Sequence, residues 1–143
     1  MIAANASIFV ALLLTASAPA SPPLSETEAK LVAAVGAQIE RRDDTHVTVA
    51  KAALDTLVRY GRPLVGRTMR ITPGRGVTLF KVHPDGICAR FGFQAGDLVT
   101  TVNRVDATTM PVVELFVKAR PGDRLVVALV RGGQPMKIEI KVK

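Results

Sequence analysis

The stretch of sequence that decides the expected fold is DGICARFGFQAGDLVTTVN, residues 85–103. A short apolar helical turn with Ile87 and Phe91 ends at Gly92, and a tight turn at Gly96 leads into a strand over residues 98–102, where β-branched residues dominate. Both glycines are expected to adopt positive φ, because a helix stops at the first and a turn enters a strand at the second. Asp97 is expected to accept hydrogen bonds from the amides of that turn.

This order of elements resembles the central signature of bacterial PDZ domains, a Pro-x-Gly/Ser helical turn followed by a Gly-Asp turn and an apolar strand ending in Asn-Gly. His83-Pro84-Asp85-Gly86 opens the signature here, and Arg104 stands where the family usually has its second glycine. The resemblance implies an α+β, PDZ-like fold, which is a small, partly open antiparallel β-barrel or sandwich with two helices. A helical lead-in is expected to precede it.

The lead-in carries a second resemblance. Asp43-Asp44-Thr45-His46, the apolar pattern that follows it and Arg70-Ile71-Thr72-Pro73 are similar to the segment leading into the PDZ domain of type II secretion system protein C. The likeness to the PDZ domains of HtrA-type periplasmic proteases is more distant, since those proteins have no obvious counterpart of this segment. Together the resemblances cover roughly residues 43–143 and imply a periplasmic component of type II secretion.

Length and charge limit the function further. The 143 residues suffice for one domain with short appendages, and the formal net charge of +7 is concentrated in the second part of the chain. This charge favours anionic partners such as an acidic protein face, a carboxylate terminus or a phospholipid surface, or it is simply a basic soluble surface. No nucleic-acid partner is expected, because there is no Trp, only one Tyr and no basic helix with interleaved aromatic residues.

The N-terminal residues indicate export. An apolar run over residues 8–14 precedes Ala18-Pro19-Ala20, which fits a signal peptide removed after residue 20. The alternative is an uncleaved anchor in the inner membrane, with the rest of the chain facing the periplasm. We therefore expect residues 1–20 to be a signal peptide or anchor, residues 21–60 a linker and helical lead-in, and residues 61–143 the PDZ-like domain.

Periodicity predicts the remaining elements. A helix is expected to begin near Ser25, and a second helix to span Val47–Tyr60. Strands are expected over residues 77–82, 125–130 and 136–142, the last two joined by a hairpin at Gly132-Gly133. A helix over residues 110–119 is expected to begin after Thr109 as N-cap.

In the PDZ family a peptide binds between a strand and a helix, and its carboxylate is held by the loop before that strand. The resemblance implies that a protein or peptide segment, including a C-terminus, adds to the strand over residues 77–82. The competing choice of carboxylate loop is Leu64-Val65-Gly66-Arg67. The expected peptide-binding residues are Gly74, Arg75, Gly76, Val77, Thr78, Leu79, Phe80, Met110, Val113 and Val117.

No catalytic motif, metal-ligand set or cofactor-binding motif is found in the sequence. Cys88 is the only cysteine and is expected to be a small buried hydrophobe, while His46 and His83 have no assignable catalytic partners. The expected function is therefore non-catalytic protein or peptide binding, with secretion-system proteins among the partners. The alternatives are a structural assembly part with a closed groove and a PDZ adaptor related to HtrA-type proteases.

Overall fold

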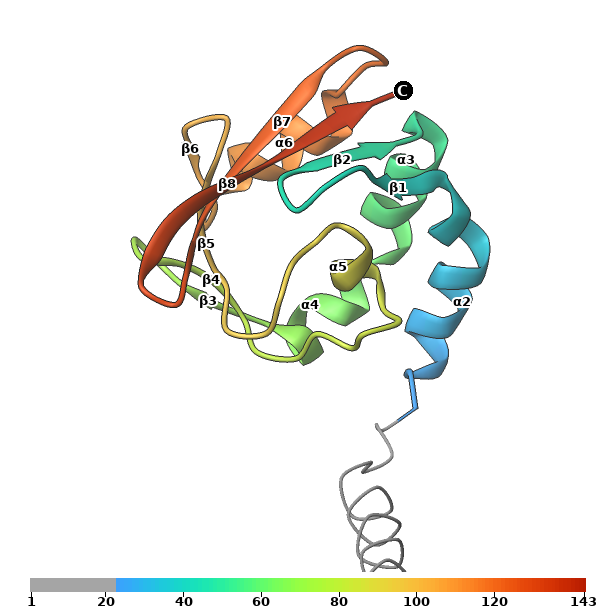
Figure 1. Cartoon of the computed structure of the whole chain (residues 1–143), viewed down its shortest axis with the longest axis horizontal. Coiled ribbons are helices and arrows are strands. Elements are labelled where there is room, and N and C mark those ends of the chain that lie inside the picture. The colour runs from blue at the N-terminus through green and yellow to red at the C-terminus, as the bar shows by residue number, and fades with distance from the viewer. Residues whose placement is uncertain (1–22) are drawn as a thin grey trace, which may run out of the picture.

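The structure is a computed structural model that describes residues 23–143, so the expected leader over residues 1–20 lies outside the described residues. Helices and strands alternate along the chain (Figure 1). No helix between residues 23 and 143 is long and apolar enough to cross a membrane. The helices are α2 (Glu26–Val35), η1 (Gly36–Gln38), α3 (Lys51–Tyr60), α4 (Arg62–Thr68), α5 (Ile87–Arg90) and α6 (Met110–Lys118). The strands are β1 (Ile39–Arg41), β2 (His46–Val49), β3 (Met69–Thr72), β4 (Gly76–Leu79), β5 (Leu98–Val102), β6 (Val105–Asp106), β7 (Arg124–Arg131) and β8 (Gln134–Val142).

One open sheet organises the molecule. Its strand order is β1-β2-β8-β7-β5-β4-β3, with β6 paired to β5. All pairs are antiparallel except β2 with β8, which run parallel in the register His46↔Glu139 to Val49↔Val142. The α+β, PDZ-like fold expected from the sequence is confirmed, with α5 and α6 as its two helices. The sheet is mixed rather than purely antiparallel, because a strand from the lead-in joins it.

The expected helix over Val47–Tyr60 is wrong in its first turn. Residues 46–49 form β2, and the helix begins only at Lys51. Val47, Thr48 and Val49 are three consecutive β-branched residues, which favour a strand once partners exist on both sides. Those partners are β1 and β8, which no pattern within residues 47–60 reveals.

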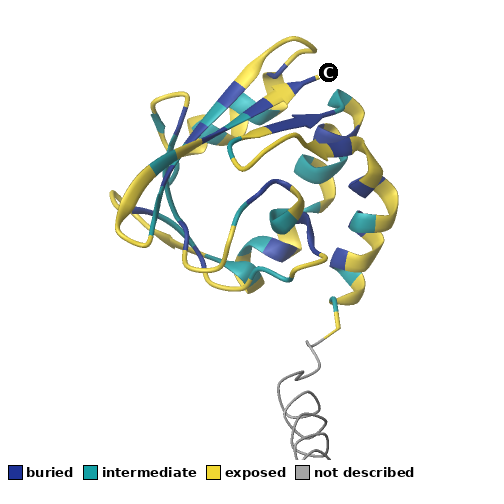
Figure 2. Ribbon diagram, viewed as in Figure 1, coloured by how far each residue is buried: buried dark blue, intermediate teal, exposed yellow. Residues whose placement is uncertain are grey.

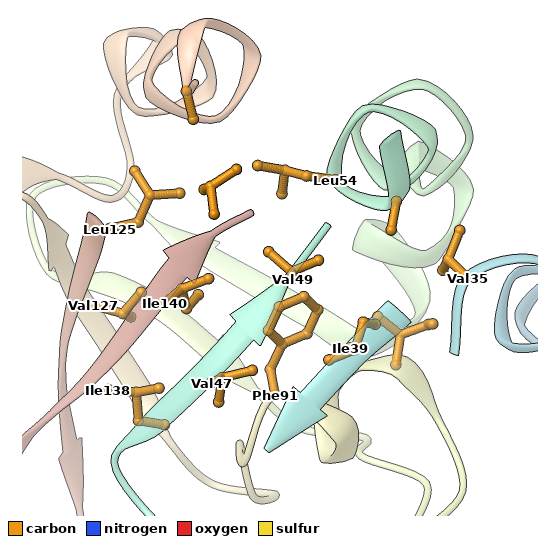
Figure 3. Close-up of a cluster of buried hydrophobic side chains, with 14 of the residues drawn as sticks. Val35, Ile39, Val47, Val49, Leu54, Phe91, Leu125, Val127, Ile138 and Ile140 are labelled. Atoms are coloured by element: carbon orange, nitrogen blue, oxygen red, sulfur yellow. The ribbon is translucent and has the colours of Figure 1, made fainter. Parts of the chain in front are cut away.

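The hydrophobic core is shared between the lead-in and the rest of the chain. Val35, Val47 and Leu54 belong to the same buried cluster as Leu125 and Ile140 (Figure 3). Helix α2 is buried on its inner side and exposed on its outer side (Figure 2). The cluster therefore continues across the boundary expected between residues 60 and 61.

The turns that the sequence marked have the expected backbone. Gly92 and Gly96 have φ of 88° and 92°, and the hairpin glycines Gly132 and Gly133 have 57° and 77°. An L-residue rarely adopts such angles, so these positions favour glycine. Along β8, which includes the strand expected over residues 136–142, Ile138, Ile140 and Val142 are buried while Lys137 and Lys141 are exposed, as in a half-buried strand.

Asp97 connects three parts of the fold. Its carboxylate accepts two hydrogen bonds from Arg131, at 2.8 Å from Nε and 2.7 Å from Nη2, and one from the Gln94 N–H at 2.9 Å. Arg131 also donates to the Gly92 carbonyl at 2.9 Å. The Asp97 side chain is 1% exposed, so its charge depends on these partners. This pair fixes the Gly92–Asp97 loop to the end of β7.

Asp97→Asn is expected to lower the free energy of unfolding by about 3 kcal/mol, because it leaves Arg131 without its buried anion. Asp123→Asn is the matched control. Asp123 also follows a glycine and accepts a hydrogen bond from the N–H three residues earlier, but it is exposed and has no ion pair with an arginine side chain among residues 23–143. Urea unfolding followed by circular dichroism measures both variants. Equal losses in the two variants would contradict a special role for the buried pair.

A second contact joins the lead-in to the signature stretch. Glu28 of α2 is buried at 9% exposure, and a Cβ placed on Gly86 would overlap its Oε1 atom. Gly86 immediately precedes α5 and has φ of −87°, which any residue can adopt. A side chain at residue 86 would therefore have to displace the Glu28 carboxylate, although the backbone conformation of Gly86 itself accommodates one.

Gly86→Ala is expected to destabilise the protein by about 1–2 kcal/mol through overpacking against Glu28. Where the backbone conformation suits alanine and there is space for its side chain, a Gly→Ala substitution usually stabilises the folded protein. Gly66→Ala in α4 is the control, since a Cβ there meets nothing within 4 Å and is expected to be neutral or stabilising. Thermal melts of the two variants provide the comparison. A Gly86→Ala protein as stable as the unmutated chain would show that α2 is not held at this contact.

Candidate functional site

The strand over residues 77–82, to which a peptide was expected to add, has no free edge. Its regular part is β4, whose Val77 and Thr78 pair with Val99 and Leu98 of β5 on one side. On the other side β4 pairs with β3 along its whole length. The expected addition of a peptide to this strand is therefore wrong, because both rows of main-chain groups are already used. Leu79 is also 2% exposed and is a core residue rather than a contact surface.

The free edge on this side of the sheet belongs to β3. The Phe80 N–H donates to the Thr68 carbonyl, so the hydrogen-bonded pairs of the β3–β4 ladder continue at Arg70↔Thr78 and Thr72↔Gly76. By the same alternation, the main-chain groups of Ile71 point away from β4. The Met69 carbonyl also points outward, whereas the Met69 N–H donates to Val65 of α4. The free edge therefore offers one donor and two acceptors at Met69 and Ile71.

The turn between β3 and β4 is the loop in which a carboxylate was expected to bind. Gly74 has φ of 76°, and its N–H donates to the Thr108 hydroxyl at 3.4 Å. The Arg75 N–H donates to the Thr72 carbonyl at 3.0 Å. Gly76 is buried, and a Cβ there would lie 2.6 Å from the Val99 carbonyl. Two of the amides expected to hold a carboxylate therefore already have acceptors within the protein.

The competing loop, residues 64–67, is part of helix α4. Leu64 is buried, while Gly66 and Arg67 are exposed. The last turn of α4 leads directly into the free strand, because the helix ends at Thr68 and β3 begins at Met69. This segment thus lies at the start of the free edge.

Helix α6 has two apolar sides. Val112, Leu115 and Phe116 pack on the core, while Met110, Val113 and Val117 are 77%, 45% and 52% exposed. The last three recur at helical spacing on one face. They are called the α6 strip here. Thr109 is the N-cap residue as expected, but its hydroxyl donates to the Asp106 carbonyl instead of capping the helix.

Contacts at both ends relate the α6 strip to the free edge. The turn after β3 is bound to Thr108, two residues before α6, through the Gly74 N–H. At the other end of α6, the Lys51 ammonium donates to the Val117 carbonyl at 3.1 Å, and α3 continues into α4, which packs on β3. These contacts connect α6 to β3 through the β3–β4 turn at one end of the helix and through α3 and α4 at the other. Ile71, 51% exposed, pairs with Val77 and shares its face of the sheet.

One hollow lies away from the free edge. A depression of about 530 Å³ is lined by residues of α6, the β5–β6 turn and the start of β7, among them Asn103, Glu114, Lys118 and Arg124. None of the α6 strip residues lines it. The depression is therefore separate from the free edge and its surroundings.

Two features of the described residues bear on catalytic chemistry, namely metal-ligating groups and the two histidines. Within residues 23–143 no group of three His, Cys, Asp or Glu side chains could hold a metal ion. His46 lies between Asp43, at 2.9 Å from Nδ1, and Glu139, at 3.9 Å from Nε2, on an exposed surface. His83 accepts a hydrogen bond from the Asp85 N–H at 3.0 Å, as a turn residue does. The Thr45 hydroxyl lies 3.0 Å from His46 Nδ1, on the same exposed surface.

No protein-family model and no curated protein matches the chain. Three solved structures illustrate what it is similar to. An aminopeptidase N family protein from Idiomarina loihiensis is 24% identical with a TM-score of 0.41, over 50% of this chain and 12% of that one. A serine endoprotease from Yersinia pestis is 35% identical with a TM-score of 0.38, over 63% and 35%. The PDZ domain of EpsC from Vibrio cholerae is 19% identical with a TM-score of 0.37, over 63% and 91%.

The thiol of Cys88 is expected to react slowly. Burial, and secondarily the negative charge of Glu28, raise its pKa to about 11. At pH 8 the thiolate is then roughly a hundredfold scarcer than for an ordinary cysteine. Labelling of Cys88 by iodoacetamide, measured by mass spectrometry, is expected to be roughly a hundredfold slower in the folded protein than in the protein unfolded by urea. Equal rates in the two states would indicate an accessible, reactive thiol.

Proposed function

We propose that this protein is a non-catalytic, PDZ-like binding module that takes up an extended protein segment along the free edge of β3. The observation that carries the proposal is the outward direction of the Met69 carbonyl and of the Ile71 N–H and carbonyl at the unpaired edge of β3. An extended segment placed there continues the sheet and satisfies those groups. Unpaired edges invite such additions.

Side-chain selectivity comes from the apolar groups around this edge. Ile71 and the α6 strip are exposed, although large apolar side chains are usually buried. In a strand added to β3, alternate side chains project to the face that carries Ile71. We infer that those side chains are apolar and contact Ile71 and Val113.

Binding along β3 does not need the terminal carboxylate that the sequence led us to expect. The Gly74 and Arg75 amides already donate within the protein, so binding does not depend on a free C-terminus. Internal segments are expected to bind as well as terminal ones. Peptides with free and amidated ends distinguish the two modes.

The cellular role proposed is that of an exported, periplasmic component of type II secretion, in substrate recruitment or assembly. The sequence resemblance over residues 43–143 supports it. If residues 1–20 remain attached, the module is held at the inner membrane. The second candidate is a structural part whose site is closed by another subunit, and the exposed α6 strip favours that candidate equally. A secretion operon around the gene would support either role over that of a protease-related adaptor.

Ile71→Pro tests strand addition directly. Proline removes the outward N–H of Ile71 and is tolerated at an edge strand, so stability is expected to change by about 1 kcal/mol or less. Binding of peptides selected from a random library against the full chain is expected to weaken about tenfold or more, through the lost hydrogen bond and the proline ring. Fluorescence polarisation with labelled peptides measures the affinity.

Ile71→Thr is the matched control. It keeps the N–H and a β-branched side chain, so main-chain pairing survives while part of the apolar contact is lost. Peptide binding unaffected by Ile71→Pro would rule out addition to β3. Failure of every library peptide to bind, with the NMR signals of Ile71 and Val113 unchanged, would leave the structural role.

A further inference from the structure

One part of the chain contains several basic residues and no acidic ones. Between residues 56 and 84 there is no Asp or Glu, while this stretch contains Arg59, Arg62, Arg67, Arg70, Arg75 and Lys81. All six side chains are exposed. They are called the cationic segment here.

No member of the cationic segment has an acidic partner among residues 23–143. Arg59 lies 5.5 Å from the centre of the Tyr60 ring, and Arg70 lies 5.9 Å from that of Phe80. Cations elsewhere are paired more fully, as Lys51 is with Asp55 and Arg131 with Asp97. Thr108, which contacts the β3–β4 turn, donates two hydrogen bonds to the Asp106 carboxylate.

Three members of the cationic segment lie in β3 or directly beside it. Arg70 is in β3 itself, Arg67 is in the last turn of the helix before it, and Arg75 is in the turn after it. Figure 1 shows α4 and the β3–β4 hairpin along the same side of the molecule. A segment bound along β3 therefore passes at least three unpaired positive charges.

We propose that the segment bound at the free edge is acidic, with carboxylates alternating with apolar residues. This proposal rests on the proposed function and specifies the ligand of the same edge. Arg70 pairs with Thr78, and Ile71 pairs with Val77, on opposite faces of the sheet. A segment that pairs with β3 alternates in the same way. It thus places its carboxylates beside Arg70 and its apolar side chains beside Ile71.

An anionic lipid surface fits this arrangement less well. A bilayer surface would need the cations and the exposed apolar side chains on one side of the molecule. The alternation of β3 places Arg70 and Ile71 on opposite faces, and headgroups leave the main-chain donor of Ile71 without a strand partner. An extended segment contacts the Arg70 side chain, the Ile71 side chain and the Ile71 N–H at the same time.

The experiment compares three capped peptides of nine residues in which valine alternates with glutamate, glutamine or lysine. The full chain is expected to bind the glutamate peptide about tenfold more tightly than the glutamine peptide, since several exposed charge contacts contribute a modest amount each. The lysine peptide is expected to bind most weakly. Raising the salt from about 50 to 500 mM is expected to remove most of the advantage of glutamate.

The triple variant Arg67→Gln, Arg70→Gln, Arg75→Gln is expected to lose the preference for glutamate. Its control, Arg120→Gln, Lys137→Gln, Lys141→Gln, removes the same charge from exposed positions away from β3 and is expected to keep the preference. Equal losses in both variants would overturn the proposal in favour of general attraction by net charge.

The remaining outcomes separate this inference from the function on which it rests. Equal binding of the glutamate and glutamine peptides, still abolished by Ile71→Pro, would overturn acidic selection and leave strand addition intact. Binding of phosphatidylglycerol vesicles without binding of the glutamate peptide would overturn it in favour of a lipid surface. Failure of all three peptides, together with failure of the random library, would overturn both proposals.

Discussion

The buried pair of Asp97 with Arg131 is the interaction on which the arrangement around the free edge depends. The Asp97 carbonyl accepts from the Leu79 N–H, and the Gly96 N–H donates to the Leu79 carbonyl, so the same turn also fixes the end of β4. Among residues 23–143, strand β3 has no sheet neighbour other than β4. The position of the free edge is therefore set, through β4, by a charge pair beside the end of β5 that pairs with β4.

The parts of the fold that could be predicted from the sequence are those whose cause is local. Gly92 and Gly96 were predictable because positive φ is a property of a single residue, and β8 because alternation of buried and exposed residues requires only its own sequence. Arg104 shows the limit of this argument. Arg104 has φ of 67°, at a position where the PDZ signature usually has glycine. The adjacent Asn103 stabilises the turn, because its side-chain amide donates to the Arg124 carbonyl and accepts from the Val126 N–H.

The parts that could not be predicted depend on which strands become neighbours. Residues 47–49 suit either a helix or a strand, and pairing with β8, about ninety residues later in the register, decides the outcome. The candidate site likewise depends on the order of the strands in the sheet. Val77 and Ile71 are both apolar residues in short β-branched stretches, and only the strand order shows that Ile71 is at an edge while Val77 is between two strands.

An exposed strand edge needs protection from copies of itself, and the cationic segment supplies it. Two copies meeting at β3 would bring Arg67, Arg70 and Arg75 of each chain together without intervening acids, and like charges at an edge oppose such pairing. The same charges attract an acidic segment, so one set of side chains both disfavours pairing with a second copy of the chain and favours binding of the acidic segment. Attraction to anions and resistance to self-association therefore have the same physical source. An edge that was neutral would have neither property.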